Sequence, residues 1–175
     1  MNDRELMFLS AVEQRELIAT RQVSSREMTE AALRRIGELE PQLNAFITVD
    51  PEGAIRSAEI ADEAIRRGDQ VGPLNGVPIS IKDLEATSGL RTTYGSIIYQ
   101  DLVPDKDSVV AERIRQSGAV ILGKTNTPEL TLAFETDNLI YGRTNNPYDL
   151  DRTPGGSSGG AGAIIASGGS PVDLV

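Results

Sequence analysis

Lys82 is the first residue in the 175-residue sequence whose type and position suit proton transfer at a hydroxyl group. It ends the strand-like segment Ile79–Lys82, in which apolar and polar residues alternate, and it precedes Asp83. A lysine at the end of a buried strand loses hydration, which lowers its pKa. The neutral amine can then act as a general base toward a serine hydroxyl. The alternative is an ordinary surface lysine that pairs with Asp83.

The second such segment is PGGSSGG, residues 154–160, in which glycines flank Ser157 and Ser158. Glycine adopts backbone conformations forbidden to other residues and lets a substrate approach the backbone closely. The segment runs directly into the apolar residues 163–166, whereas a flexible linker is polar and repetitive. The pattern favours an active-site turn, with a glycine–serine linker as the alternative.

Composition limits the chemistry, because the sequence contains no histidine and no cysteine. Within these residues, this excludes Ser-His-Asp and Cys-His catalysis, thiolate chemistry and most zinc sites. The net charge of −9 argues against nucleic acid or an anionic membrane surface as the main partner. We find no signal peptide or transmembrane stretch, so we expect a cytoplasmic protein with no membrane partner.

Apolar periodicity predicts the elements that must position these residues. The second predicted helix opens with the capping pair Ser24 and Glu27 and ends before Pro41, and the third stops at Gly68. Helices followed by strand–helix–strand predict one α/β domain with a mainly parallel or mixed sheet. The predicted helices span residues 4–19, 25–39, 51–67, 108–117, 128–134 and 160–168, and the predicted strands span 45–49, 79–82 and 119–122.

The segment GAVILGKT, residues 118–125, matches the phosphate-binding pattern G-x-x-x-x-G-K-[ST]. That loop must follow a strand and open a helix, so that backbone N–H groups face the phosphate. Here the middle residues themselves are strand-like, a helix precedes them, and Pro128 follows soon after Lys124. We therefore prefer a helix end at Gly118 followed by a core strand.

Five segments occur in a fixed order: GVPISIKD, TTYGS, GKTNTPEL, GRTNNPYD and TPGGSSGG. Together they resemble the amidase signature family of serine hydrolases, and the resemblance extends to the last residue. It implies an α/β fold that is the N-terminal part of the amidase signature fold, a mixed sheet flanked by helices. Residues 1–175 are then expected to form the N-terminal part of a single amidase domain, truncated before the nucleophile serine.

The resemblance also implies a Ser–cis-Ser–Lys triad. In that arrangement Lys82 is the base, and Ser157 relays the proton. The peptide bond between Gly156 and Ser157 is expected to be cis. The nucleophile is a third serine beyond Val175, and Ser167 and Ser170 do not fit its spacing. Supporting roles are implied for Asp83, Gly155, Gly156, Ser158 and Gly159, and Asn126 is expected to be a structural or pocket-wall residue.

The implied activity is hydrolysis of a small-molecule carboxylic amide through an acyl-enzyme, without a metal or organic cofactor. The chain alone is expected to be inactive. One alternative is the glutaminase-type subunit of a tRNA-dependent amidotransferase. Another is a non-catalytic binding or interaction module, since half a sheet leaves an unpaired edge that favours homo-oligomers.

Overall fold

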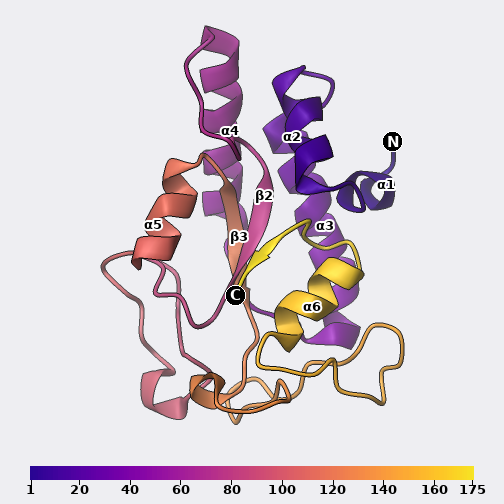
Figure 1. Cartoon of the computed structure of the whole chain (residues 1–175), viewed down its shortest axis with the longest axis vertical. Coiled ribbons are helices and arrows are strands. Elements are labelled where there is room, and N and C mark those ends of the chain that lie inside the picture. The colour runs from indigo at the N-terminus through magenta and orange to yellow at the C-terminus, as the bar shows by residue number, and fades with distance from the viewer.

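The computed structural model describes all residues 1–175 and contains a four-stranded mixed sheet in the order β1-β3-β2-β4. Strand β1 runs antiparallel to β3, whereas β2 is parallel to both β3 and β4. Helices flank the sheet on both sides (Figure 1). The predicted α/β class and mixed sheet are confirmed. The strands are β1 (Phe46–Val49), β2 (Pro78–Lys82), β3 (Val120–Thr125) and β4 (Asp173–Leu174).

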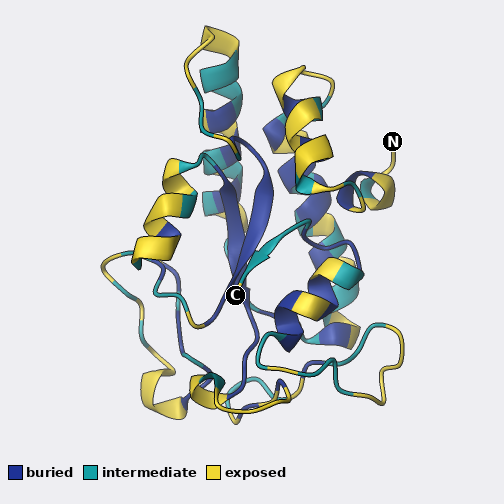
Figure 2. Ribbon diagram, in the orientation of Figure 1, coloured by how far each residue is buried: buried dark blue, intermediate teal, exposed yellow.

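The two central strands form the middle of the core, and every residue of β2 and β3 is buried (Figure 2). Strand β3 continues beyond the predicted 119–122 through Gly123, Lys124 and Thr125. Helix α5 (Val109–Gln116) precedes it, and Gly118 has a φ of 84° between the two elements. The Gly-Lys-Thr sequence is thus part of a core strand, as preferred above, and it opens no helix.

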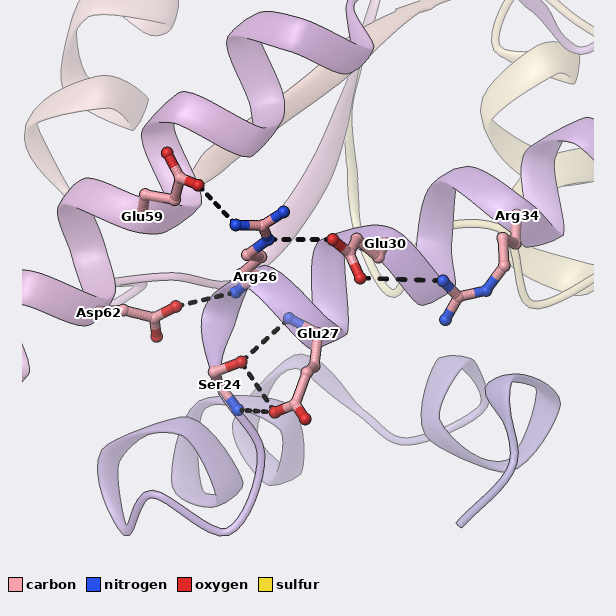
Figure 3. A network of polar contacts seen from close by, with 7 residues as sticks. All are labelled: Ser24, Arg26, Glu27, Glu30, Arg34, Glu59 and Asp62. Carbon is pink, nitrogen blue, oxygen red and sulfur yellow. Dashed lines mark hydrogen bonds and ion pairs between the residues drawn. The ribbon is translucent and has the colours of Figure 1, made fainter.

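Two long helices, α3 (Ser25–Leu43) and α4 (Pro51–Arg67), lie against each other and carry a polar network at their contact (Figure 3). The Asp62 carboxylate accepts hydrogen bonds from the backbone N–H groups of Ser25 at 2.7 Å and Arg26 at 3.0 Å. A carboxylate at this position satisfies unpaired donors at the start of α3 and complements the helix dipole. Asp62 therefore ties the start of α3 to α4.

Three predicted helices differ from the structure. Residues 4–19 form two helices, α1 (Asp3–Met7) and α2 (Ala11–Ala19), because Ser10 and Glu13 make a capping box that starts a new helix. Helix α3 continues past Pro41, since the buried Leu43 anchors its last turn. The predicted helix over 128–134 is reduced to the 3-10 turn η2 (Glu129–Thr131), in which Leu130 has a positive φ of 48°.

The remaining helices agree with the sequence patterns. Helix α4 ends at Gly68, whose φ of 76° is the left-handed conformation that glycine favours. Helix α6 (Gly159–Ala166) follows the glycine–serine turn, and a second 3-10 turn, η1 (Ile97–Tyr99), lies in the loop after β2. No helix is both long enough and apolar enough to cross a membrane.

Candidate active site

Lys82 is the last residue of β2, and its side chain reaches the turn before α6. Its Nζ donates hydrogen bonds to Ser157 Oγ at 2.8 Å and to Ser158 Oγ at 2.9 Å. Only 3% of Lys82 is exposed, so the alternative of a surface lysine is wrong. The structure therefore brings together the lysine and the serine pair that the sequence analysis selected.

Burial changes the pKa of Lys82 at this contact. It lowers the pKa of Lys82, because an ammonium group is less stable away from water, and the negative charge of Asp173 opposes that shift. A lysine with a lowered pKa is more readily neutral near physiological pH. The neutral amine can accept a proton from the serine hydroxyl that it contacts.

Side chains from two loops hold the glycine–serine turn in place. Thr136 Oγ1 donates to the carbonyl oxygen of Gly155 at 2.9 Å and accepts from the N–H of Gly159 at 2.9 Å. Thr127 Oγ1 donates to the carbonyl oxygen of Ser157 at 3.1 Å. The peptide bond between Gly156 and Ser157 is cis. Because the turn is held at both ends and lies against Lys82, the linker alternative is wrong.

Two glycines of this turn have no room for a side chain. A Cβ on Gly156 would lie 2.8 Å from the carbonyl carbon of Glu135. A Cβ on Gly159 would lie 2.3 Å from Thr136 Oγ1. Close backbone approach thus accounts for glycine at both positions.

Asp83 follows Lys82 but supports a different part of the site. Its buried carboxylate accepts hydrogen bonds from Thr93 N at 2.9 Å and from Thr93 Oγ1 at 2.6 Å. Burial raises the pKa of Asp83, and the Thr93 hydrogen bonds oppose that shift. Asp83 thereby anchors the TTYGS loop, and it forms no ion pair with Lys82 within 4.0 Å.

Asn126 is fully buried and uses both ends of its amide. Its Nδ2 donates to Gly142 O at 3.2 Å and Thr144 Oγ1 at 3.0 Å. Its Oδ1 accepts from Thr127 N at 3.0 Å and Asn138 Nδ2 at 2.7 Å. Of the two expected roles, this geometry favours the structural one.

Sequence reasoning gave no place in the site to two charged residues near it, the buried Lys124 and the half-buried Asp173. Lys124 Nζ donates to Glu85 O and, at 2.8 Å, to Thr87 Oγ1, and burial lowers its pKa to about 8. Burial raises the pKa of Asp173 to about 6. In both cases the available signal was a single charged residue in a mostly apolar stretch, VILGK for Lys124 and PVDLV for Asp173.

The other serines near the end of the chain serve local backbone contacts. Ser167 Oγ donates to Ala163 O at 2.7 Å, and Ser170 Oγ donates to Val172 O at 2.7 Å. Neither hydroxyl bonds to Lys82, in line with their exclusion as nucleophiles above. No group of three or more acidic side chains is close enough together to hold a metal ion.

Comparison with known proteins identifies the family that this fold and site define. The amidase family model matches residues 27–174. The chain therefore belongs to the amidase family, and the resemblance inferred from the five sequence segments is confirmed.

Two curated relatives are each named as a subunit of glutamyl-tRNA(Gln) amidotransferase. The one from Acidothermus cellulolyticus is 44% identical over 170 residues, which is 97% of this chain and 34% of the relative. The one from Dehalococcoides mccartyi is 43% identical over 163 residues, which is 93% of this chain and 33% of the relative. The chain thus spans about a third of the length of these relatives.

Solved structures of the family superpose closely on this chain. A bacterial aryl acylamidase of the amidase signature family has a TM-score of 0.90 and 36% identity, covering 95% of this chain and 35% of its own. Fatty acid amide hydrolase has a TM-score of 0.93 and 29% identity, covering 98% of this chain and 30% of its own. The predicted fold is thereby confirmed.

Proposed function

We propose that the protein containing these residues is an amidase that hydrolyses a carboxylic amide through an acyl-enzyme. The observation that carries this proposal is the 2.8 Å contact between Lys82 Nζ and Ser157 Oγ. A buried lysine in contact with a serine hydroxyl can supply a general base without a histidine. Family membership supports the same reaction class.

The proton path that we propose runs through Ser157. Neutral Lys82 accepts the proton of the Ser157 hydroxyl, and Ser157 accepts one from a nucleophilic serine as that serine attacks the amide carbon. The protonated lysine then returns the proton by the same route to the leaving nitrogen. Water cleaves the resulting ester, releasing the acid and regenerating the serine.

We further propose that residues 1–175 are the N-terminal part of the amidase domain and lack the nucleophilic serine. Ser167 and Ser170 are engaged elsewhere, and the relatives are about three times as long. The donors that stabilise the oxyanion would also come from outside these residues. Loss of a nucleophile and of oxyanion donors removes most of the catalytic rate, so this part alone would be inactive.

The test compares residues 1–175 with the product of the reading frame that continues beyond codon 175. Each protein is treated with a fluorophosphonate probe and assayed for release of acid from aryl, alkyl and glutamine amides. The proposal expects labelling and hydrolysis by the longer product alone. Labelling of residues 1–175 would contradict the incomplete site, whereas a folded longer product that cleaves none of the amides would overturn the amidase assignment.

A second candidate is the glutaminase-type subunit of a tRNA-dependent amidotransferase. The curated relatives favour it, since those named for the glutamyl-tRNA(Gln) enzyme reach 44% identity. The assay separates the two candidates by substrate. Glutamine hydrolysis that depends on partner proteins would support this candidate, and efficient cleavage of simple amides by the isolated longer product would oppose it.

A third candidate is a non-catalytic interaction module. Strand β4 lies at an edge of the sheet, and Leu132 and Phe134 are 82% and 93% exposed. Open edges and exposed apolar side chains favour self-association. Dimers in sedimentation together with binding of a hydrophobic dye would support this candidate, whereas a monomer that binds no dye would exclude it.

A further inference from the structure

Asp173 lies on β4, the edge strand next to β2, and β2 carries Lys82. In the sheet, Asp173 pairs with Ser80, and Lys82 pairs with Thr125 on the other side of β2. Ser80 and Lys82 are two positions apart, so their side chains lie on the same face. Thr125 Oγ1 donates to Asp173 Oδ2 at 2.9 Å. The side chain of Asp173 therefore reaches over β2 toward Thr125 of β3, on the face of the sheet that carries Lys82.

The other carboxyl oxygen of Asp173 has no hydrogen-bond partner. Oδ1 is buried and unpaired, which is costly for an ionised group unless positive charge lies nearby. The positive charges of Lys124 and Lys82 both lower the pKa of Asp173. Only Lys82 shares its face of the sheet, because Lys124 pairs with Ile81 and its Nζ bonds to Glu85 O and Thr87 Oγ1. Helix α6, which packs against β4, contributes no titratable side chain. Lys82 is thus the cation on the face of the sheet that holds the Asp173 carboxyl group.

We propose that Asp173 is a positioning residue that stabilises the charged form of Lys82. This role rests on the proposed function, in which Lys82 becomes an ammonium group when it takes the proton from Ser157. A carboxylate within the same buried region lowers the free energy of that ammonium. Asp173 itself gains and loses no proton in this step. Its role parallels that of the carboxylate that supports a histidine base in other serine hydrolases.

The charge on Lys82 can be followed directly by NMR, because the sequence contains only three lysines, Lys82, Lys106 and Lys124. The full chain is labelled with 13C at lysine Cε, and the three signals are assigned with single Lys→Arg variants and titrated with pH. In Asp173→Asn we expect the midpoint of Lys82 to fall by about one pH unit, since the variant removes the charge that favours the ammonium. The midpoint of the exposed Lys106 should stay constant.

The matched control is Asp101→Asn, which removes an exposed carboxylate of the same size 19 positions from Lys82. It should leave all three midpoints in place. An unchanged Lys82 midpoint in folded Asp173→Asn would overturn the proposal, and so would an equal shift in Asp101→Asn. Retained backbone amide shifts away from residue 173 establish that each variant is folded.

A second measurement needs no variant at residue 173. Asp173 ionises near pH 6 in the folded chain, so the wild-type Lys82 signal should show a second, smaller inflection there. Its absence would overturn the proposal even if Asp173→Asn does not fold. The NMR titration measures the charge of the lysine side chains and does not depend on catalytic turnover. Failure of the amidase assignment therefore appears in the hydrolysis assay, and failure of this inference appears in the NMR midpoints.

Discussion

Lys82 Nζ and Ser157 Oγ lie 2.8 Å apart although the two residues are 75 positions apart in the chain. The contact forms because the turn before α6 lies against the end of β2, where Lys82 is the last residue. The turn is held there by Thr127 and Thr136. The contact is therefore a property of the tertiary fold and not of a local sequence pattern.

Replacing the proposed base should abolish amide hydrolysis. Lys82→Met in the longer product removes the amine and keeps an apolar side chain of similar length, so kcat/KM should fall by about 10³-fold or more. Lys106→Met is the matched control, because Lys106 is an exposed lysine. Steady-state kinetics check the result. Activity of Lys82→Met within a few-fold of Lys106→Met would show that Lys82 is not the base.

Two glycines of α6 provide a matched test of close packing behind the turn. A Cβ on Gly160 would lie 2.5 Å from the backbone nitrogen of Asn126, whereas a Cβ on Gly162 would meet nothing within 4 Å. Gly160→Ala should therefore lower the free energy of unfolding by about 2 kcal/mol. Gly162→Ala should raise it by about 0.5 kcal/mol through helix propensity. Urea unfolding measures both, and equal effects would contradict this packing.

The buried Lys124 should make stability depend on pH. Its pKa is about 8 in the folded chain, below the ordinary value of 10.5, so the unfolded chain binds more protons between these values. Stability should therefore rise with pH across that range, by up to about 3 kcal/mol from this residue. Below about pH 8 the residue is charged in both states and adds no slope. Lys82 should also make stability rise with pH, because its pKa in the folded chain is lowered as well.

Urea unfolding of the wild type and of Lys124→Met across that pH range checks this prediction. Lys124→Met should be less stable overall, because Glu85 O and Thr87 Oγ1 lose their donor. Its unfolding free energy should also rise less steeply with pH. Parallel curves for the two proteins would refute the assignment of the slope to Lys124.

The Asp62 carboxylate at the start of α3 should contribute more to the free energy of unfolding than the neighbouring surface ion pair between Glu59 and Arg26. Asp62→Asn weakens the cap on the N–H groups of Ser25 and Arg26, so we expect a loss of about 1 kcal/mol. Glu59→Gln breaks an ion pair with Arg26 in which both side chains are about half exposed, and should cost less than about 0.5 kcal/mol. Thermal unfolding compares the two, and the reverse order would contradict the capping role.

Local patterns were sufficient for much of the fold. Capping residues, apolar stripes and Gly68 predict the start of α3 and both ends of α4 correctly, because these signals act over a few residues. The break at Ser10 was missed although Ser10 and Glu13 form the same type of capping box as Ser24 and Glu27. The prediction that α3 ends before Pro41 was wrong. Burial of Leu43 outweighs the one backbone hydrogen bond that proline cannot donate.

Less of the site than of the fold could be predicted from the sequence. Lys82 and the serine pair were selected individually, but only the family resemblance joined them, because no local pattern encodes a contact across 75 positions. Lys124 and Asp173 were missed for the same reason. Their roles depend on strand neighbours and on burial, and both of these properties arise from the sheet order.

The central claim is that Lys82 and Ser157 act as one relay. The most direct measurement is a double-mutant cycle of kcat/KM for amide hydrolysis by the longer product, with Lys82→Met, Ser157→Ala and the double variant. Residues of one relay are not additive, so the double variant should be about as slow as the slower single variant. If the two losses multiply in the folded double variant, the residues act independently and the relay is contradicted.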